Sequence, residues 1–302
     1  MKYLRLILFV VPLDINCMRI GKMEASKEIK SMKLYDHIDR VRRELQELGY
    51  KEEDPLKVED VCKYDQMHYY GTQAIDEAIK DLGISSAHHI LDVGSGLGGP
   101  ARYLAHKTNC AVTALELQED LHTEAENLTR RCNLQHKLSH MSGDFLQLDL
   151  GADKFDFLVS WLVFLHIVDK KQLFQQCFYS LKPGGKIFIE DFFQQTGVVL
   201  TKEDNESYER DLYMKNLPEK DVYVKHLEEA GFIDVEFLDL TSEFLSFVSK
   251  RQQEFNEHKE RHVRVIGQGA YDGLNYFYTT VKRLFADGLC GGCRVTASKP
   301  TS

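Results

Sequence analysis

The sequence predicts an α/β fold in which a mostly parallel sheet is covered by helices on both faces. Short apolar runs typical of buried strands alternate along the chain with longer segments of helical periodicity. A glycine cluster at residues 94–99 joins one such run to a helix, and open α/β sheets bind ligands at such turns. With 302 residues, the chain is long enough for this core and for additional segments around it.

The N-terminal region divides into two parts. Residues 1–23 carry a basic start and a short apolar run, loosely like a secretory signal, but no small-x-small cleavage site follows. We therefore interpret them as a poorly ordered leader. Residues 24–85 are assigned to a helical arm and active-site cap, because residues 24–50 place apolar side chains at helical spacing and reach a stop at Gly49.

A segment rich in aromatic and polar side chains, residues 64–72, precedes the glycine cluster. A helix is predicted immediately after it, over residues 73–82. One interpretation of the segment is a loop that covers a helix end. The other is a cap that closes over a ligand and contacts the substrate, and the residue types leave both open.

The glycine cluster is the strongest single feature. Residues 89–93 form an apolar run typical of a buried strand, and Gly94 and Gly96 permit a sharp turn close to a ligand because neither has a Cβ. Pro100 suits the first turn of the following helix. The pattern Gly94-x-Gly96-x-x-Gly99 fits the dinucleotide fingerprint, in which a helix N-terminus holds a pyrophosphate.

The same stretch resembles the first motif of S-adenosylmethionine (AdoMet) methyltransferases, as Asp92-x-Gly94-x-Gly96-x-Gly98. AdoMet has no phosphate; it carries a sulfonium, an amino acid head group and an adenosine. The Asp92 carboxylate would repel a pyrophosphate and attract an ammonium group. The resemblance therefore implies that Asp92, Gly94, Gly96 and Gly98 bind AdoMet.

Acidic residues follow the next two predicted strands. Residues 111–117 form a buried strand that ends near Glu116, about 20 residues beyond the glycine turn, where a carboxylate accepts both ribose hydroxyls of a nucleotide. Gln118 follows on the same rim. The third strand ends in Gly-Asp-Phe, which resembles the adenine-binding segment of methyltransferases, and the resemblance assigns Asp144 and Phe145 to the cofactor.

The fourth predicted strand, residues 155–161, ends in Ser160 and Trp161 at the sheet edge where ligands bind. We assign Ser160 to the cofactor site. Three roles are open for Trp161: packing over the cofactor, attracting a substrate ammonium to its indole face, or anchoring the core. His166 is the best-placed candidate base, with a structural histidine as the alternative.

Residues 181–185, Leu-Lys-Pro-Gly-Gly, end a helix before a fifth strand that reaches Asp191. This segment is characteristic of class I methyltransferases. Together with Asp92, Glu116 and Asp144, it identifies the chain by resemblance as a member of that family, with AdoMet as its cofactor. The resemblance implies a Rossmann-like, seven-stranded, mostly parallel sheet with helices on both faces and an antiparallel last strand.

The C-terminal region completes this domain, which we assign to residues 86–302. The remaining predicted elements are a helix and two strands: residues 219–230, 232–240 and 292–298. A lid insertion at residues 241–291 lies between those strands, and its apolar spacing predicts two helices. Tyr208 and Tyr213 are candidate substrate-binding residues beside the lid, because their aromatic rings suit contact with an amine.

The segment before the first strand narrows the substrate prediction. Its Asp-Gln-x-His-Tyr-x-Gly pattern, residues 65–71, looks like that of the sarcosine and dimethylglycine N-methyltransferases. The resemblance implies that Gln66, His68 and Tyr69 line the active site, with His68 as a second candidate base. The predicted function is AdoMet-dependent N-methylation of a small amine or amino acid.

Several alternatives stay open. A phosphobase, a sterol or another small apolar acceptor would use the same core. A phosphobase would favour a basic cluster in the lid, and the basic residues there are dispersed: Lys215, Lys250, Arg251 and Arg283. A catalytically silent AdoMet-binding module is another possibility, and a dinucleotide oxidoreductase is opposed by Asp144, because dehydrogenases usually lack an acid there.

Composition limits the partners. A net charge of −9 argues against nucleic acid, and no apolar stretch approaches the roughly 18 residues of a membrane span. Seven scattered cysteines favour a cytoplasmic location. Cys290 and Cys293 have CxxC spacing without a second pair or a histidine cluster, so we predict no metal and interpret them as a glycine turn feeding the last strand. The predicted partner is a small-molecule substrate, with no prediction of oligomeric state.

Overall fold

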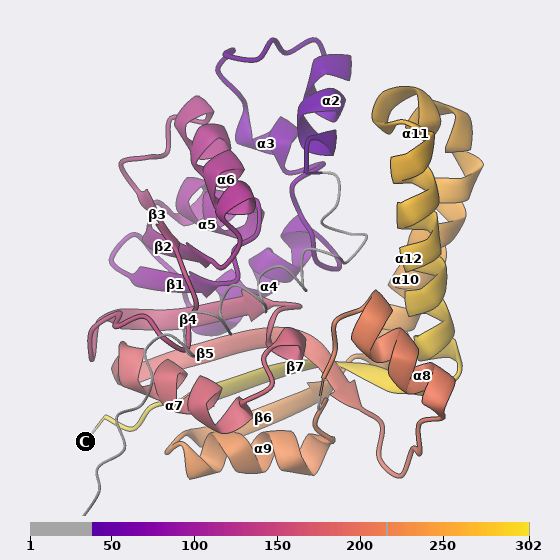
Figure 1. Ribbon diagram of the computed structural model, residues 1–302. Helices are drawn as coiled ribbons and strands as arrows, with labels where there is room; N and C mark the ends of the chain where they lie inside the picture. Colours follow the sequence, from indigo (N-terminus) through magenta and orange to yellow (C-terminus); the bar gives the residue numbers. More distant parts are fainter. Residues whose placement is uncertain (1–37, 216, 302) are drawn as a thin grey trace, which may run out of the picture.

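The computed structural model describes residues 38–215 and 217–301, and its centre is one seven-stranded sheet (Figure 1). The strands, in chain order, are β1 (His89–Val93), β2 (Ala111–Glu116), β3 (Leu138–Ser142), β4 (Phe155–Trp161), β5 (Leu181–Gln194), β6 (Ile233–Asp239) and β7 (Cys290–Ser298). Their spatial order is β3-β2-β1-β4-β5-β7-β6. Strands β1 to β5 pair in parallel, whereas β7 lies antiparallel between β5 and β6. The predicted sheet, with its antiparallel last strand, is confirmed.

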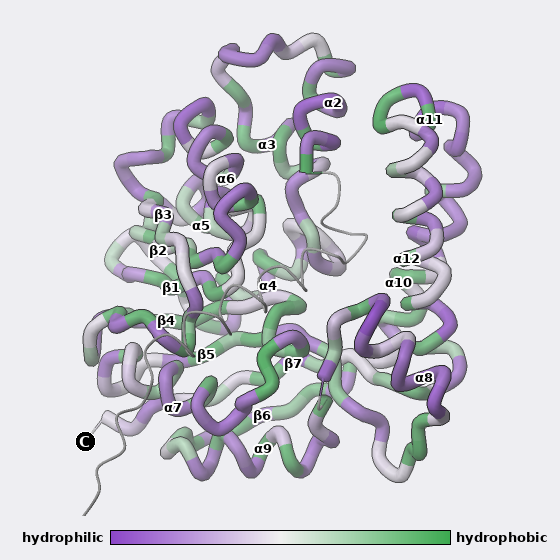
Figure 2. The backbone as a smooth tube through the Cα atoms, viewed as in Figure 1, coloured by the Kyte–Doolittle hydropathy of each residue, from purple (hydrophilic) through white to green (hydrophobic). Residues whose placement is uncertain are grey.

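The sheet is buried on both faces, as expected for parallel strands between helices. Helices α4 (Thr72–Leu82) and α5 (Gly99–Thr108) pack on one face, in a cluster that includes Val159 of β4. Helices α7 (Lys170–Ser180) and α9 (Lys220–Glu229) pack on the other face, where the neighbouring Leu158 points. Figure 2 shows the resulting contrast between mostly hydrophobic central strands and the hydrophilic helices α2 and α6.

The remaining elements include the other helices of the core and the connections. They are α2 (Arg40–Glu47), α3 (Val58–Val61), α6 (Glu119–Arg131), the 3₁₀ helix Phe164–His166, α8 (Lys202–Glu206) and the π-helix Ser207–Asp211. Helix α7 ends at Ser180, so the Leu-Lys-Pro-Gly-Gly segment begins β5 instead of ending the helix.

The N-terminal arm is tied to the sheet domain by a buried ion pair. Asp65 and Arg102 are both fully buried, and Arg102 Nη2 donates to Asp65 Oδ2 at 2.8 Å. The predicted leader, residues 1–23, and the arm helix over residues 24–37 lie outside the described residues. The assignment of residues 24–85 to a separate arm and cap stays a prediction.

The lid contains three helices, α10 (Thr241–Glu257), α11 (Lys259–Ile266) and α12 (Gln268–Ala286), so the prediction of two was wrong. A break at His258 separates the first two without a glycine or proline to mark it. In Figure 1, α10 and α12 run side by side, and α11 returns toward α2. There Arg261 Nη2 contacts Glu44 Oε2 at 2.6 Å, which joins the lid to the arm.

The prediction of a glycine turn at the CxxC pattern was also wrong, because Cys290 and Gly292 lie within strand β7. A Cβ on Gly292 would lie 2.5 Å from Cγ of Phe244, so the missing side chain leaves room for the lid to pack on the sheet. Cys290 and Cys293 are both buried free thiols. Among residues 38–215 and 217–301, no group of histidine, cysteine or acidic side chains could hold a metal ion. No helix in that part of the chain is long and apolar enough to cross a membrane.

Candidate functional site

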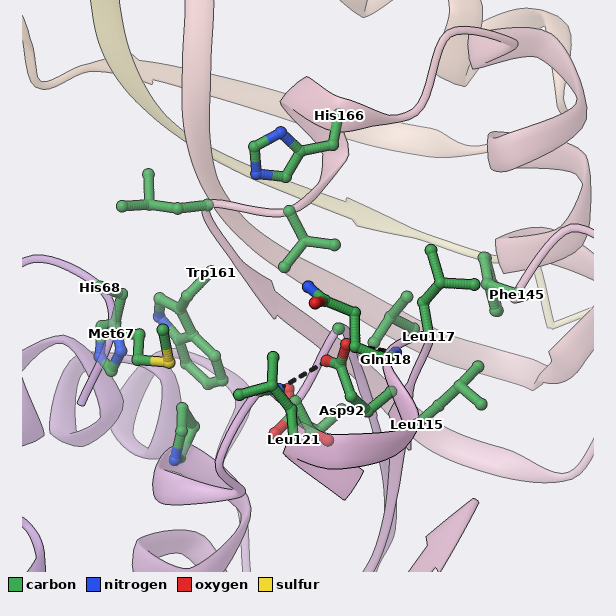
Figure 3. Close-up of a pocket in the computed structure, with 18 of the residues that line it drawn as sticks. Met67, His68, Asp92, Leu115, Leu117, Gln118, Leu121, Phe145, Trp161 and His166 are labelled. Atoms are coloured by element: carbon green, nitrogen blue, oxygen red, sulfur yellow. Dashed lines mark hydrogen bonds between the residues drawn. The ribbon is translucent and has the colours of Figure 1, made fainter. Parts of the chain in front are cut away.

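A pocket lies at the carboxyl ends of the central strands (Figure 3). Its lining comes from the glycine turn, the ends of β2 and β3, the turn after β4 and the segment before α4. The predicted site residues that line it are Asp92, Gly94, Gly96, Glu116, Gln118, Asp144, Phe145, His68, Trp161, His166 and Tyr213. With Tyr213 from the segment after the π-helix, the topology brings residues from six separate segments into one cavity, at the edge where open α/β sheets bind ligands.

The glycine turn forms one wall. Gly94 and Gly96 have φ values of +73° and +54°, which disfavour any residue with a side chain. A Cβ on Gly94 would lie 2.5 Å from Cγ2 of Val163, and one on Gly96 would lie 3.4 Å from Sδ of Met67. The absent side chains therefore keep the backbone accessible from the pocket.

Glu116 fixes the shape of this turn. Its Oε2 accepts the N–H of Gly96 at 2.8 Å, and its Oε1 accepts the N–H of Gln118 at 2.9 Å. The carboxylate is buried and lines the pocket at the end of β2. A carboxylate oxygen can accept more than one hydrogen bond, which suits this side chain to contact hydroxyl groups of a ligand.

Asp92 is a buried acid of the pocket with a raised pKa. It is 1% exposed, and its Oδ2 has no hydrogen-bond partner within the described part of the chain. Burial, reinforced by the nearby Glu116 carboxylate, raises the pKa of Asp92 to about 8. A buried acid of this kind favours a cationic ligand, because a positive charge would stabilise its ionised form.

Asp144 and Phe145 continue the lining beyond β3. Asp144 is partly exposed, and its Oδ1 accepts the N–H of Leu146 at 2.9 Å. Phe145 is buried beside it. This pair places a carboxylate and an aromatic ring at the side of the pocket next to Glu116.

His166 lies across the pocket, on the 3₁₀ helix after β4 (Figure 3). Its Nδ1 is 3.1 Å from the carbonyl oxygen of Tyr213, which can only accept, so Nδ1 carries the proton and Nε2 keeps a lone pair. Burial lowers the pKa of His166 to about 4. The imidazole is therefore neutral near pH 7 and can accept a hydrogen bond or a proton.

The backbone around His166 is held from two sides. Lys170 is buried, and its Nζ donates to the carbonyl oxygens of Phe164, at 2.5 Å, and of Ile167. Asp191, within β5, is also buried and interacts with the backbone of Phe164. Burial raises the pKa of Asp191, and the Lys170 ammonium opposes this shift. The two charges therefore fix the turn that carries His166.

His68 and Trp161 form an apolar corner of the pocket. Their ring centroids are 5.5 Å apart, and both side chains are buried. Nε2 of His68 is 3.0 Å from the carbonyl oxygen of Gly71, so Nε2 carries the proton. Burial lowers the pKa of His68 to about 4. The corner therefore adds aromatic surface and a second neutral imidazole.

Five predicted site residues do not line this pocket. Gly98 faces Arg102, whose Nη1 would lie 2.8 Å from an added Cβ, and Ser160 donates its hydroxyl to the carbonyl of Val93 at 2.9 Å. The other three are engaged elsewhere: Gln66 donates to Asp65, Tyr69 packs against lid residues including Phe244, and Tyr208 is buried in the same lid cluster. These placements give Gly98 and Ser160 structural contacts instead of pocket contacts.

Sequence reasoning missed the apolar lining. Met67, Leu121 and Ile167 line the pocket, as does Val163 beside the glycine turn. Such residues are indistinguishable from core positions in a sequence. The backbone offers another signal that was invisible, since the lining residue Leu162 has a φ of +56°, a strained value that is frequent at functional sites.

Comparisons with known proteins agree with this geometry. Residues 90–185 match the family model described as "Methyltransferase domain". The chain is 29% identical over 239 residues to phosphoethanolamine N-methyltransferase 1 of Triticum aestivum, covering 77% of this chain and 46% of the relative. It is 32% identical over 186 residues to a glycine/sarcosine/dimethylglycine N-methyltransferase of Actinopolyspora halophila, covering 59% of this chain and 31% of the relative.

A solved structure shares the fold. Phosphoethanolamine N-methyltransferase 2 of Haemonchus contortus, in complex with phosphomonomethylethanolamine and S-adenosylhomocysteine, superposes with a TM-score of 0.72 and 24% identity. The superposition covers 78% of this chain and 55% of that one. The chain spans about half the length of the phosphoethanolamine relatives it matches. Residues 90–185 thus match a methyltransferase domain, and the sheet topology and the pocket fit its cofactor, S-adenosyl-L-methionine.

Proposed function

We propose that the chain is an enzyme that transfers a methyl group from AdoMet to the nitrogen of a small acceptor molecule. When bound, AdoMet supplies a methyl group on a positively charged sulfur, and the acceptor nitrogen displaces S-adenosylhomocysteine directly. This chemistry needs no covalent intermediate with the protein. The residues of the chain must instead hold both molecules in line and exclude water.

The arrangement of the pocket's carboxylates supports the cofactor roles that we assign. Asp92 would pair with the ammonium of the AdoMet head group, because its Oδ2 is buried and unpaired among the described residues. Glu116 would accept the ribose hydroxyls, and Gln118 beside it borders the same position. Asp144 would accept the adenine amine, with the ring against Phe145. Gly94 and Gly96 would let the ligand approach the backbone.

One observation carries the proposal: the three carboxylates share a single pocket with His166, whose free Nε2 is unprotonated. A neutral imidazole can accept a hydrogen bond from the acceptor N–H and orient the nitrogen lone pair. It also adds no positive charge beside a cationic methyl donor. Trp161 and His68 would cover the acceptor, and the aromatic face of Trp161 would attract a substrate cation.

For the acceptor, we propose a phosphobase such as phosphoethanolamine, with a small amino acid such as sarcosine as the second candidate. The phosphoethanolamine relative matches 77% of the chain, compared with 59% for the amino acid relative. This order reverses the preference drawn from residues 65–71.

The test is a methylation assay with labelled AdoMet and the purified chain. Phosphoethanolamine, sarcosine, dimethylglycine and a sterol are offered separately, and incorporation of label is measured against a reaction without acceptor. Methylation of phosphoethanolamine with the highest kcat/KM supports the proposal. Methylation of only the sterol would refute an amine acceptor, and AdoMet binding without turnover on any of them would favour a catalytically silent module.

A further inference from the structure

Arg251 lies on lid helix α10, and its guanidinium contacts Tyr278 of α12. These two helices run side by side (Figure 1). The guanidinium carbon of Arg251 lies 4.3 Å from the ring centroid of Tyr278, 4.9 Å from that of Tyr69 and 5.4 Å from that of Phe247. These three aromatic rings hold the guanidinium in place by cation–π interactions. The rings supply no negatively charged partner for the N–H donors of the guanidinium.

Two of its donors have no partner. Nε and Nη2 of Arg251 are buried, yet neither makes a hydrogen bond within the described residues. Other arginines of the chain contact a carboxylate within 3.1 Å: Arg102 with Asp65, Arg261 with Glu44, Arg283 with Asp204 and Arg294 with Glu190. Buried charges in proteins are normally paired, so these unpaired donors indicate a place for an anion that the protein itself does not supply.

The surroundings of Arg251 are continuous with the pocket. Tyr69, which lies under the guanidinium, directly follows His68 in the pocket wall. The aromatic cluster that contains Tyr69 also includes Leu162 and Tyr213, and both of these line the pocket. Tyr208 belongs to the same cluster, where its buried hydroxyl interacts with the Cys290 thiol. The Arg251 guanidinium and the Tyr208 phenol thus border the cluster that adjoins the pocket, and neither lines the pocket itself.

We infer that Arg251 binds an anionic group, a phosphate or a carboxylate, on the methyl acceptor. This inference rests on the proposed function, since it concerns the acceptor of the same site. A guanidinium presents parallel N–H donors whose spacing matches either anion. The acceptor would then lie with its nitrogen toward His166 and its anion toward the lid. An uncharged sterol would leave the buried donors unpaired.

The first experiment measures anion binding independently of turnover. Inorganic phosphate and acetate are each titrated in the presence of S-adenosylhomocysteine, and the Tm is recorded for the wild type, Arg251→Gln and Lys250→Gln. Lys250 is the matched control, because it lies next to Arg251 but is exposed and forms an ion pair with Glu254. We expect phosphate, acetate or both to raise the Tm of the wild type and of the Lys250 variant, but not that of the Arg251 variant.

The second experiment uses kinetics. For phosphoethanolamine and sarcosine, Arg251→Gln should raise KM by about 10- to 100-fold, as expected for lost hydrogen bonds to a charged group, with a smaller change in kcat. Arg251→Lys should recover part of this loss. The KM for ethanolamine, which lacks an anion, should change less than twofold. Comparing the two anionic acceptors distinguishes a phosphate site from a carboxylate site.

The outcomes separate this inference from the proposed function. An anion effect on Tm that disappears in Arg251→Gln supports the inference even if no amine is methylated, in which case only the proposed reaction fails. Equal anion effects in the wild type and in Arg251→Gln overturn it, as does the absence of any anion effect in the wild type. An equal loss of activity on ethanolamine and phosphoethanolamine would assign Arg251 a structural role.

Discussion

Replacing Asp92 by asparagine should change stability and cofactor binding in opposite directions. In the ligand-free protein, burial raises the pKa of Asp92 to about 8 from an ordinary 3.8. The folded state therefore binds this proton more tightly than the unfolded state, and the free energy of unfolding falls as the pH rises from about 4 to about 8. Asparagine does not titrate, so the free energy of unfolding of the variant lacks this decrease with pH.

The size of the effect follows from the shift. About four pKa units, 8 − 3.8, correspond at most to about 6 kcal/mol of destabilisation at pH 8, and to almost none at pH 4. With about 2–4 °C of Tm for each kcal/mol in a large domain, the Tm of Asp92→Asn should exceed that of the wild type by up to about 12–24 °C at pH 8. AdoMet binding should respond in reverse, because the bound cation stabilises the carboxylate that the variant lacks.

Thermal unfolding between pH 5 and pH 8 measures the first effect, and calorimetric titration of AdoMet measures the second. We expect the Kd of Asp92→Asn to exceed that of the wild type by about 10- to 100-fold at pH 8, with the ratio shrinking toward pH 6, where the wild-type carboxyl is already protonated. Asp144→Asn, at a partly exposed position of the same pocket, serves as the control. A Tm difference that is independent of pH would refute the reasoning.

Three further substitutions test other parts of the site. Glu116→Ala removes the acceptor of two backbone N–H groups, so the Kd for AdoMet should rise about 10- to 100-fold in calorimetry while acceptor binding changes far less; unchanged AdoMet affinity contradicts the assignment. His166→Phe keeps a ring but no acceptor, so kcat should fall about 100-fold or more in the methylation assay, and a kcat within twofold of the wild type excludes the catalytic role. Gly94→Ala places a Cβ against Val163 and should abolish AdoMet binding. The control Gly288→Ala, also at positive φ but with no atom within 4 Å, should lower the free energy of unfolding by only about 1 kcal/mol. Equal losses in both variants would contradict the role of the glycine turn.

The positions of the strands along the chain and the place of the pocket could be predicted because local patterns indicate both. Strand ends that carry Asp92, Glu116 and Asp144 must meet at one edge of a parallel sheet, whatever the details of packing. The same argument placed His166 and Trp161, which follow β4 directly. These residues line one pocket in the structure, while their binding roles stay proposals.

Features that depend on distant contacts could not be predicted. Gly98 belongs to the glycine motif, but its missing side chain makes room for Arg102, which reaches back to the arm. Gly292 has the sequence signature of a turn, yet it lies in β7 under a ring from the lid. Arg251 has the pattern of an exposed helical charge, and only the packing of α12 reveals that its donors are buried.

The aromatic corner of the pocket has a practical consequence. Trp161 is the sole tryptophan of the chain, and its indole N–H is buried without a partner among the described residues. Emission excited at the red edge of protein absorption therefore originates from one position, in the wall that a ligand would touch. Changes in the fluorescence of Trp161 should therefore report ligand binding in the pocket in real time, without an added label.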